Sequence, residues 1–471
     1  MGKRLFVRNA VAAHLLLVSM PALSSGQTFT NLASFSGGAG CGPLSVSLVQ
    51  DINGDLYGTA EGGGNSGKNP YYCYGGCGTI FRITPENTVG PAYEFGISGP
   101  GINPGVGLGI GAGGQLYGTT IWGGTNNLGI IFRFIQGGNQ LSVLYESSST
   151  TGVANTPIQG ADGNLYGTGS GGTYGEGTVF KLTPDGGLTV LYNFSGPDGS
   201  APSQLIQATD GNFYGTTSYG GVYGSGTVFR ITPKGALTTL YSFTGGNDGS
   251  GPDGGVTQAV SENFPASIFY GTTGGGVYGY GTIYKFAAAG ALTTLHSFDG
   301  SDGSYPQAPL VQGTDGNFYG TTDVGGPNTN DGTIFQITPL GNFTLLHNFD
   351  GGDGAYLFGS GLVQRTDGTF FGTSESGGDT GCGTIYSLSM GLGPFVKTLP
   401  QFGRPGITIK ILGTNLTGAT SVTFNGRAAS FSVGSPTEIS AVVPAGATTG
   451  KLQVTIPGGR LLSSGPFVVL P

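Results

Sequence analysis

The chain has 471 residues, too many for one small core, so its length predicts two or more domains. Gly and Pro number 97 and 26, a content that usually signals disorder, but 11% of residues are aromatic and only 9% are charged, which excludes a typical disordered chain and suits short strands joined by glycine turns. The formal net charge of −8 becomes −11 when the three cations before Asn9 are left out, which argues against nucleic acid or an anionic membrane as a partner.

The N-terminus has the pattern of a secretory signal peptide. Lys3, Arg4 and Arg8 precede an apolar run at 10–20, and small residues follow at 21–26. The run is too short to cross a bilayer, which takes about 20 apolar residues. We therefore expect residues 1–26 to be removed, no transmembrane segment in the remaining chain, and a mature protein that is secreted or held at the cell surface.

Two short patterns recur between residues 28 and 390. Tyr-Gly-Thr, once altered to Phe-Gly-Thr, begins at Tyr57, Tyr117, Tyr166, Tyr214, Tyr270, Tyr319 and Phe371. Gly-Thr-[Ile/Val]-[Phe/Tyr], once degenerate, follows each of them at Gly78, Gly129, Gly177, Gly226, Gly281, Gly332 and Gly383. Units of about 48 to 60 residues with several short strands are typical of a propeller. We predict an all-β fold with a seven-bladed β-propeller at 27–391.

One unit shows the strands expected in each blade. Strand A at 203–208 meets strand B at 213–218 through the tight turn Asp-Gly-Asn. A glycine-rich loop leads to strand C at 226–232, which is apolar on both faces, as a sheet between two neighbouring sheets requires, and strand D at 237–243 forms the outer edge.

The segment 29–35 resembles a strand D but stands before the first strand A, and the seventh unit lacks a convincing strand D of its own. We predict that this N-terminal strand completes blade seven and closes the ring, so that no sheet edge is left exposed.

The repeat, as in DGNFYGTTSYGGVYGSGTVFRITPKGALTTLYSF at 210–243, resembles the bacterial GloVer (Gloeo_Verruco-type) tandem repeat over about residues 28–390. The resemblance implies an exported protein and no particular activity. The tail resembles an IPT/TIG immunoglobulin-like domain through ITIKILGTNL at 407–416 and SVTFNG at 421–426. Alternating strands, an Asn-Gly hairpin signal and Pro-Gly turns also favour a small Ig-like β-sandwich at 392–471.

The B–C loops and the D–A connectors share one face of such a propeller. They are longer and more variable than the A–B and C–D turns, so we expect any binding site on this B–C/D–A face. Four residues after the start of the Tyr-Gly-Thr pattern, Glu61, Asp323 and Glu375 occupy equivalent positions in blades that closure makes neighbours. Three such carboxylates could bind calcium, supply an acid and a base for glycoside chemistry, or be solvated loop residues.

Aromatic residues in the B–C loops are further ligand candidates. Trp122, Tyr219 and Tyr223 could stack on sugar rings or pack between adjacent loops.

The D–A connectors repeat an Asp/Gly pattern that is a weaker metal signal. Asp299, Asp302, Asp350 and Asp353 suit calcium by their chemistry, although turn formation explains the same pattern and no run matches an EF-hand loop. Calcium is the only cofactor that the sequence suggests.

The histidines of the repeat, His296 and His347, occupy strand D positions where other blades carry Tyr192 and Tyr241, so we expect them to be structural.

Four cysteines, Cys41, Cys73, Cys77 and Cys382, map to the B–C/D–A side of blades one and seven. An even count in an exported chain favours disulfides. Three pairings are open, of which we favour Cys73–Cys77 and Cys41–Cys382.

The leading functional hypothesis is an exported, monomeric scaffold that recognises an extracellular glycan or protein through the B–C/D–A face. The alternatives are a carbohydrate-active enzyme that uses the carboxylates of that face, and a purely structural surface protein. The sequence contains no Ser-His-Asp order, phosphate-binding lysine loop or dinucleotide motif in proper context.

Overall fold

The computed structural model describes residues 26–36, 40–43, 48–64, 76–96, 99–105, 107–153, 155–260 and 268–471. The predicted signal peptide, apart from Gly26, lies outside the described residues. Strands, turns and bends account for the regular structure of these ranges, and nowhere in them is there a helix long and apolar enough to span a membrane.

Seven antiparallel sheets precede the tail in the described chain, and each contains strands A to D in spatial order. The A strands are β2 (Val49–Gln50), β7 (Gly109–Ile110), β11 (Ile158–Gln159), β16 (Ile206–Gln207), β20 (Val256–Gln258), β24 (Val311–Gln312) and β28 (Val363–Gln364). The B strands are β3 (Leu56–Ala60), β8 (Leu116–Gly123), β12 (Leu165–Gly169), β17 (Phe213–Tyr219), β21 (Ile268–Thr273), β25 (Phe318–Thr322) and β29 (Phe370–Ser374). The C strands are β4 (Thr79–Ile83), β9 (Ile130–Ile135), β13 (Thr178–Leu182), β18 (Thr227–Ile231), β22 (Thr282–Ala287), β26 (Thr333–Ile337) and β30 (Thr384–Ser389). The D strands are β5 (Val89–Glu94), β10 (Gln140–Glu146), β14 (Leu188–Asn193), β19 (Leu237–Ser242), β23 (Leu292–Ser297), β27 (Phe343–Asn348) and, last in the ring, β1 (Thr28–Ser34). Two further strands, β6 (Gly101–Pro104) and β15 (Ser200–Pro202), pair with β8 and β17.

The A strands are shorter than expected. Strand A of the fourth sheet comprises only Ile206–Gln207 of the predicted 203–208. The residues before it leave the ladder near the propeller axis, where the Ser203 hydroxyl lies 2.6 Å from Thr216 Oγ1 and Gln204 lines a central cavity.

The two sequence patterns are coupled by packing. The glycine of Tyr-Gly-Thr lies under the aromatic ring of the following Gly-Thr-[Ile/Val]-[Phe/Tyr], so that a Cβ on Gly320 would stand 2.5 Å from Cζ of Phe335. A separation under 3 Å is a clash with a buried ring, and glycine is therefore required there.

The Asp-Gly-Asn turn explains why the stretch DGNFYGTT occurs twice. Asp210 accepts hydrogen bonds from the Asn212 backbone N–H (3.0 Å) and side-chain amide (2.9 Å), and from the Tyr214 hydroxyl (2.9 Å). Asp315 makes the same three bonds in the sixth sheet. The stretch thus specifies an A–B turn and ties it to strand B.

The predicted closure by the N-terminal strand is confirmed. Strand β1 pairs with β30 from Thr28 opposite Ser389 to Ser34 opposite Thr384. Phe35 packs in one apolar cluster with Phe371 of the last sheet and Phe81 of the first. Similar clusters lie at the other six junctions between consecutive sheets. The sheets therefore form a closed ring, in which each packs between two others.

A set of glutamines at the ends of the A strands links neighbouring sheets. At six junctions a glutamine Oε1 accepts a hydrogen bond from a backbone N–H in the A–B turn of the preceding sheet, over 2.7–3.1 Å: Gln50 from Thr366, Gln159 from Ala112, Gln207 from Ala161, Gln258 from Thr209, Gln312 from Val260 and Gln364 from Thr314. The first of these bonds crosses the seam between the last sheet and the first.

The tail is a two-sheet sandwich with the sheet orders β31-β33-β37-β36 and β32-β39-β38-β34-β35. Its strands are β31 (Lys397–Leu399), β32 (Phe402–Gly403), β33 (Thr408–Leu412), β34 (Ser421–Phe424), β35 (Arg427–Ala428), β36 (Phe431–Ser435), β37 (Glu438–Val442), β38 (Gly450–Ile456) and β39 (Gly459–Val469).

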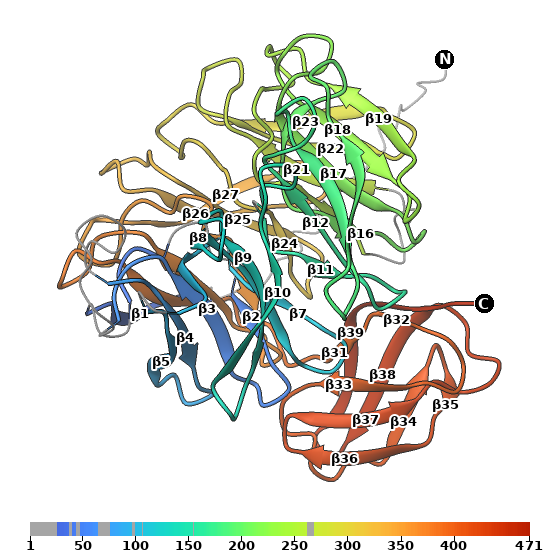
Figure 1. Cartoon of the computed structure of the whole chain (residues 1–471). Coiled ribbons are helices and arrows are strands. Elements are labelled where there is room, and N and C mark those ends of the chain that lie inside the picture. Colours follow the sequence, from blue (N-terminus) through green and yellow to red (C-terminus); the bar gives the residue numbers. More distant parts are fainter. Residues whose placement is uncertain are drawn as a thin grey trace, which may run out of the picture.

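This sandwich covers the A–B face of the propeller (Figure 1). The Thr437 hydroxyl donates to the Ile52 carbonyl (3.0 Å), and the Phe395 N–H donates to the Thr366 carbonyl (2.9 Å). Gln401 and Phe402 line two cavities of about 270 and 310 Å³ against the A–B turns of the second to sixth sheets. No described residue of the sandwich contacts the opposite, B–C/D–A face.

Candidate binding site on the B–C/D–A face

The D–A connectors reach the B–C/D–A face through a repeated corner in which one residue has a left-handed backbone. This residue is a glycine, asparagine or alanine in five sheets, but it is Tyr305 (φ 55°) and Tyr356 (φ 53°) in the sixth and seventh. Bulky residues rarely adopt this conformation, so the two tyrosines store backbone strain that points to a role for their side chains.

The corner carbonyl holds the three predicted acids in equivalent positions. Each acid donates its backbone N–H to a corner residue: Glu61 to Gly42 (3.3 Å), Asp323 to Tyr305 (3.1 Å) and Glu375 to Tyr356 (2.8 Å).

The structure brings the carboxyl groups of Asp323 and Glu61 within electrostatic reach of Glu375. Burial raises the pKa of Asp323 to about 6, and its buried Oδ1 accepts no hydrogen bond within the described chain. The pKa of Glu375 is raised by burial and then by the negative charges of Asp323 and Glu61. No group of three or more His, Cys, Asp and Glu side chains in the described ranges is arranged to hold a metal ion. The ligand-binding role of these acids stays a prediction.

A cavity of about 480 Å³ lies on the propeller axis and is lined by residues from six sheets. They include Leu108, Gln204, Tyr219, Asp253, Gln307 and Phe358. All except Tyr219 lie between a D–A corner and the A strand that follows it, so the connectors deliver one side chain each to the centre of the ring.

The polar groups of the axial cavity are only partly satisfied. Asp253 is exposed by its accessible surface and lines the cavity. The protein around its carboxyl group raises the pKa of that group, against a hydrogen bond from Ser218 that lowers it. The side-chain amides of Gln204 and Gln307 make no hydrogen bond to any described residue, whereas the amide nitrogen of Asn155 is committed to Thr168 Oγ1 (2.9 Å) and the Pro202 carbonyl (3.0 Å).

Exposed aromatic residues gather on the B–C/D–A face. Of the three predicted candidates, Tyr219 (65% exposed) lines the axial cavity, while Trp122 (41%) and Tyr223 (62%) lie on the face outside it. The same face exposes Tyr174, Tyr278, Tyr280, Tyr305, Tyr356 and Phe358.

The charge of the B–C/D–A face is all of one sign in the described ranges. Every described Lys and Arg of the propeller lies on a C strand or in an A–B or C–D turn, away from this face: Arg82, Arg133, Lys181, Arg230, Lys234, Lys285 and Arg365. The face carries acids in the B–C loops and D–A connectors of most sheets, and no described Lys or Arg pairs with them there.

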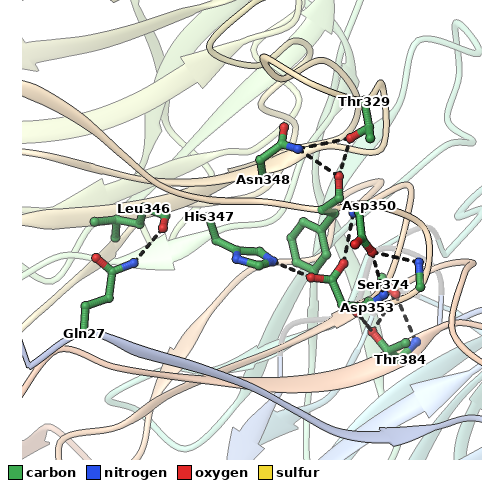
Figure 2. Close-up of polar contacts among 11 residues, drawn as sticks. Gln27, Thr329, Leu346, His347, Asn348, Asp350, Asp353, Ser374 and Thr384 are labelled. Carbon is green, nitrogen blue, oxygen red and sulfur yellow. Dashed lines mark hydrogen bonds and ion pairs between the residues drawn. The ribbon is translucent and has the colours of Figure 1, made fainter.

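The acids of the D–A connectors shape their own loops (Figure 2). Asp353 accepts hydrogen bonds from His347 Nε2 (2.7 Å) and from the Asp350 N–H (3.0 Å), and Asp350 accepts one from the Gly352 N–H (2.9 Å). The Thr384 hydroxyl donates to the Asp353 carbonyl (2.9 Å) and so ties the connector to the next sheet.

The preceding sheet repeats this arrangement. His296 bonds Asp302 (2.7 Å), whose other carboxylate oxygen accepts the Asp299 N–H (3.0 Å). Both histidines also stack on a phenylalanine of the next sheet, His296 on Phe343 (4.0 Å) and His347 on Phe29 (3.7 Å), as a structural role requires. Calcium binding by Asp299, Asp302, Asp350 and Asp353 stays a prediction.

Two of the described cysteines lie at the seam of the ring. Cys41 and Cys382, one of the two pairs favoured above, form a disulfide (Sγ–Sγ 2.14 Å) that joins the first and last sheets. Cys77 is also disulfide-bonded. The favoured Cys73–Cys77 pairing involves Cys73, which lies outside the described residues. Disulfides indicate an extracytoplasmic, oxidising setting.

Comparison with known proteins assigns the repeat. The model of the Gloeobacter/Verrucomicrobia repeat matches residues 20–173 and 153–386. The chain belongs to this repeat family. The model of the IPT/TIG domain matches residues 395–469, the sandwich that covers the A–B face. No curated protein matches this Gloeobacter/Verrucomicrobia repeat protein.

Solved structures resemble the repeat protein only distantly. A fungal alcohol oxidase in complex with copper is 13% identical, with a TM-score of 0.45, over 92% of this chain and 98% of its own. An oligogalacturonate lyase from Vibrio parahaemolyticus is 11% identical, with a TM-score of 0.48, over 77% of this chain and 93% of its own. Likeness at this level says nothing about activity.

Several residues of the site escape sequence reasoning. Asp253, Gln204, Gln307 and Phe358 reach the cavity from similar connector positions, but they comprise three residue types, so no repeated motif marks them. Only their position could have revealed them, because each residue stands one or two places after the corner residue of its connector or after the proline that follows that corner.

Proposed function

We propose that this protein is an extracytoplasmic binding protein that recognises a glycan through its B–C/D–A face, with the IPT/TIG domain as a spacer or docking module on the opposite side. The repeat and the IPT/TIG domain are those of a surface binding or scaffold protein. The observation that carries the glycan assignment is the axial cavity, which combines free amides and a carboxyl group with aromatic rings and opens among further exposed tyrosines.

The chemistry of this surface matches that of a sugar. A pyranose ring presents hydroxyl groups at its edge, which amides and carboxylates can bind, and an apolar face, which aromatic rings can cover. Tyr219 and Phe358 supply rings within the cavity, and Gln204, Gln307 and Asp253 supply polar groups to the same cavity. A cavity of about 480 Å³ also lies within the size range of small-molecule sites.

A glycan array screened with the purified mature protein, with and without calcium, tests the proposal. We expect binding to a restricted set of glycans and a loss of at least about tenfold in affinity for Tyr219→Ala, because stacking and cavity shape are lost together. Thermal melting checks that the variant is folded. Absence of binding to every glycan in both conditions would refute the proposal and favour a protein partner.

The raised pKa values of Asp323 and Glu375 favour one second candidate, a carbohydrate-active enzyme. A carboxyl group that keeps its proton near neutral pH beside an ionised one is the pairing that glycoside hydrolysis uses. Glu61→Gln and Glu375→Gln should abolish turnover of a bound oligosaccharide if these residues are catalytic, and should alter only binding if they are not.

A further inference from the structure

We propose that the axial cavity selects a cationic amino sugar, whose ammonium group pairs with the carboxylate of Asp253. This inference rests on the proposed glycan recognition and names the chemical class of the glycan. Three features of the cavity carry it: a carboxylate without a cationic partner among the described residues, aromatic walls, and free amides on the connectors to either side of that carboxylate.

The carboxylate of Asp253 has a hydroxyl partner but no cationic one. Ser218, at the end of the neighbouring strand B, donates its hydroxyl to Asp253. No described Lys or Arg lies on the B–C/D–A face, so nothing in that part of the chain neutralises the charge that Asp253 places on the axis. A carboxylate that lines a cavity without a cationic partner among the described residues attracts a ligand that brings its own positive charge.

The aromatic walls of the cavity also favour a cation over an anion. Tyr219 and Phe358 line the cavity together with Asp253, and the electron-rich faces of such rings attract ammonium groups. Uronic acids and sulfated sugars would meet the acids of the surrounding loops, Asp323 and Glu375 among them, with no Lys or Arg among the described residues of this face to receive their charge. An anionic glycan is therefore disfavoured at this site.

The free side-chain amides of Gln204 and Gln307 can bind the hydroxyl groups of the ligand. Gln204 and Gln307 line the cavity from the fourth and sixth sheets, on either side of the connector that carries Asp253, and each offers one acceptor and two donors to ring hydroxyls. A ligand with one ammonium group and several hydroxyl groups uses all of these groups at once. A 2-amino-2-deoxyhexose unit has this composition.

A matched pair of oligosaccharides tests the contribution of the ligand's positive charge to binding. A β-1,4-linked glucosamine hexamer with free amines and its fully N-acetylated counterpart share one backbone and differ at the amine positions. Isothermal titration of the mature protein near pH 6 should show at least about tenfold tighter binding of the free-amine hexamer, as expected for a charge-assisted hydrogen bond.

Two isosteric variants separate the effect of the Asp253 charge on binding from the effect of the other acids on the face. Asp253→Asn keeps the hydrogen bond from Ser218 and removes the charge. Asp379→Asn removes the same charge from an exposed residue of the same face that does not line the cavity. We expect Asp253→Asn to abolish the preference for the free-amine hexamer and Asp379→Asn to retain it. If Asp253→Asn does not fold, Tyr219→Ala, at a largely exposed position, must weaken binding of the free-amine hexamer.

The outcomes distinguish this inference from the proposed function. Equal binding of the two hexamers, or an equal effect of Asp253→Asn and Asp379→Asn, would overturn the choice of an amino sugar while glycan recognition stands. Binding of other glycans on the array but of neither hexamer would overturn it as well. Failure to bind any glycan would overturn the proposed function and this inference together.

Discussion

Replacement of Asp323 by asparagine should stabilise the protein at neutral pH. Burial raises the pKa of this carboxyl from 3.8 to about 6, so the folded state binds the proton more tightly than the unfolded state does. A carboxyl with a raised pKa contributes stability that is fully present below pH 3.8 and is lost as the pH rises through about 6. Above that pH the ionised group destabilises the fold. A shift of this size corresponds to about 3 kcal/mol at most, and partial solvent access reduces the figure to about 1–2 kcal/mol.

Denaturant midpoints at pH 4 and pH 7.5 measure the effect. Asp323→Asn should unfold at a higher midpoint than the parent protein at pH 7.5 and at nearly the same midpoint at pH 4, where the parent carboxyl is already protonated. Asp379→Asn, at an exposed position for which we expect little change, is the control. A stabilisation of equal size at both pH values, or a loss of stability at pH 7.5, would refute the assignment of a buried, unpaired carboxylate.

Three further predictions concern the ring. Deletion of residues 28–35 should lower the stability by about 5 kcal/mol or more, since Phe29, Leu32 and Phe35 each contribute about 1.5–3 kcal/mol by burial; an unchanged melting temperature would count against closure by β1. Gln312→Ala should lower the free energy of unfolding, measured by chemical denaturation, by about 1–3 kcal/mol, because the Val260 N–H loses its acceptor. No change would mean that water replaces the bond. Replacing Cys41 and Cys382 by serine should lower the free energy of unfolding by about 2–4 kcal/mol. An unchanged denaturation midpoint would show that strand pairing alone holds the seam.

The sequence predicts the repeated parts of the fold and leaves the single ones undetermined. Tyr-Gly-Thr recurs because each sheet places the same glycine under an aromatic ring, and Asp-Gly-Asn recurs in the A–B turns of three sheets. Periodicity therefore reveals the propeller and its closing strand. The glutamines of the A strands recur too, but a polar residue at a strand end looks solvated until the neighbouring turn is in place.

The cavity and the docked sandwich could not be predicted for different reasons. Asp253, Gln204 and Phe358 share a position and no chemistry, so a search for repeated residues passes over them. The contact of the IPT/TIG domain with the A–B face relies on single hydrogen bonds, such as Thr437 to Ile52, made by turn residues that are also suited to water.

The pairing of β1 with β30 also sets the order in which the molecule can mature. Strand β1 begins at Thr28, directly after the predicted signal peptide, and its partner begins at Thr384. At a synthesis rate of about 5–20 residues per second, β1 emerges from the ribosome roughly 20–70 s before β30 exists. Strand β1 therefore has no partner until the last sheet has been synthesised. Only then can the ring close and the Cys41–Cys382 bond join its two ends.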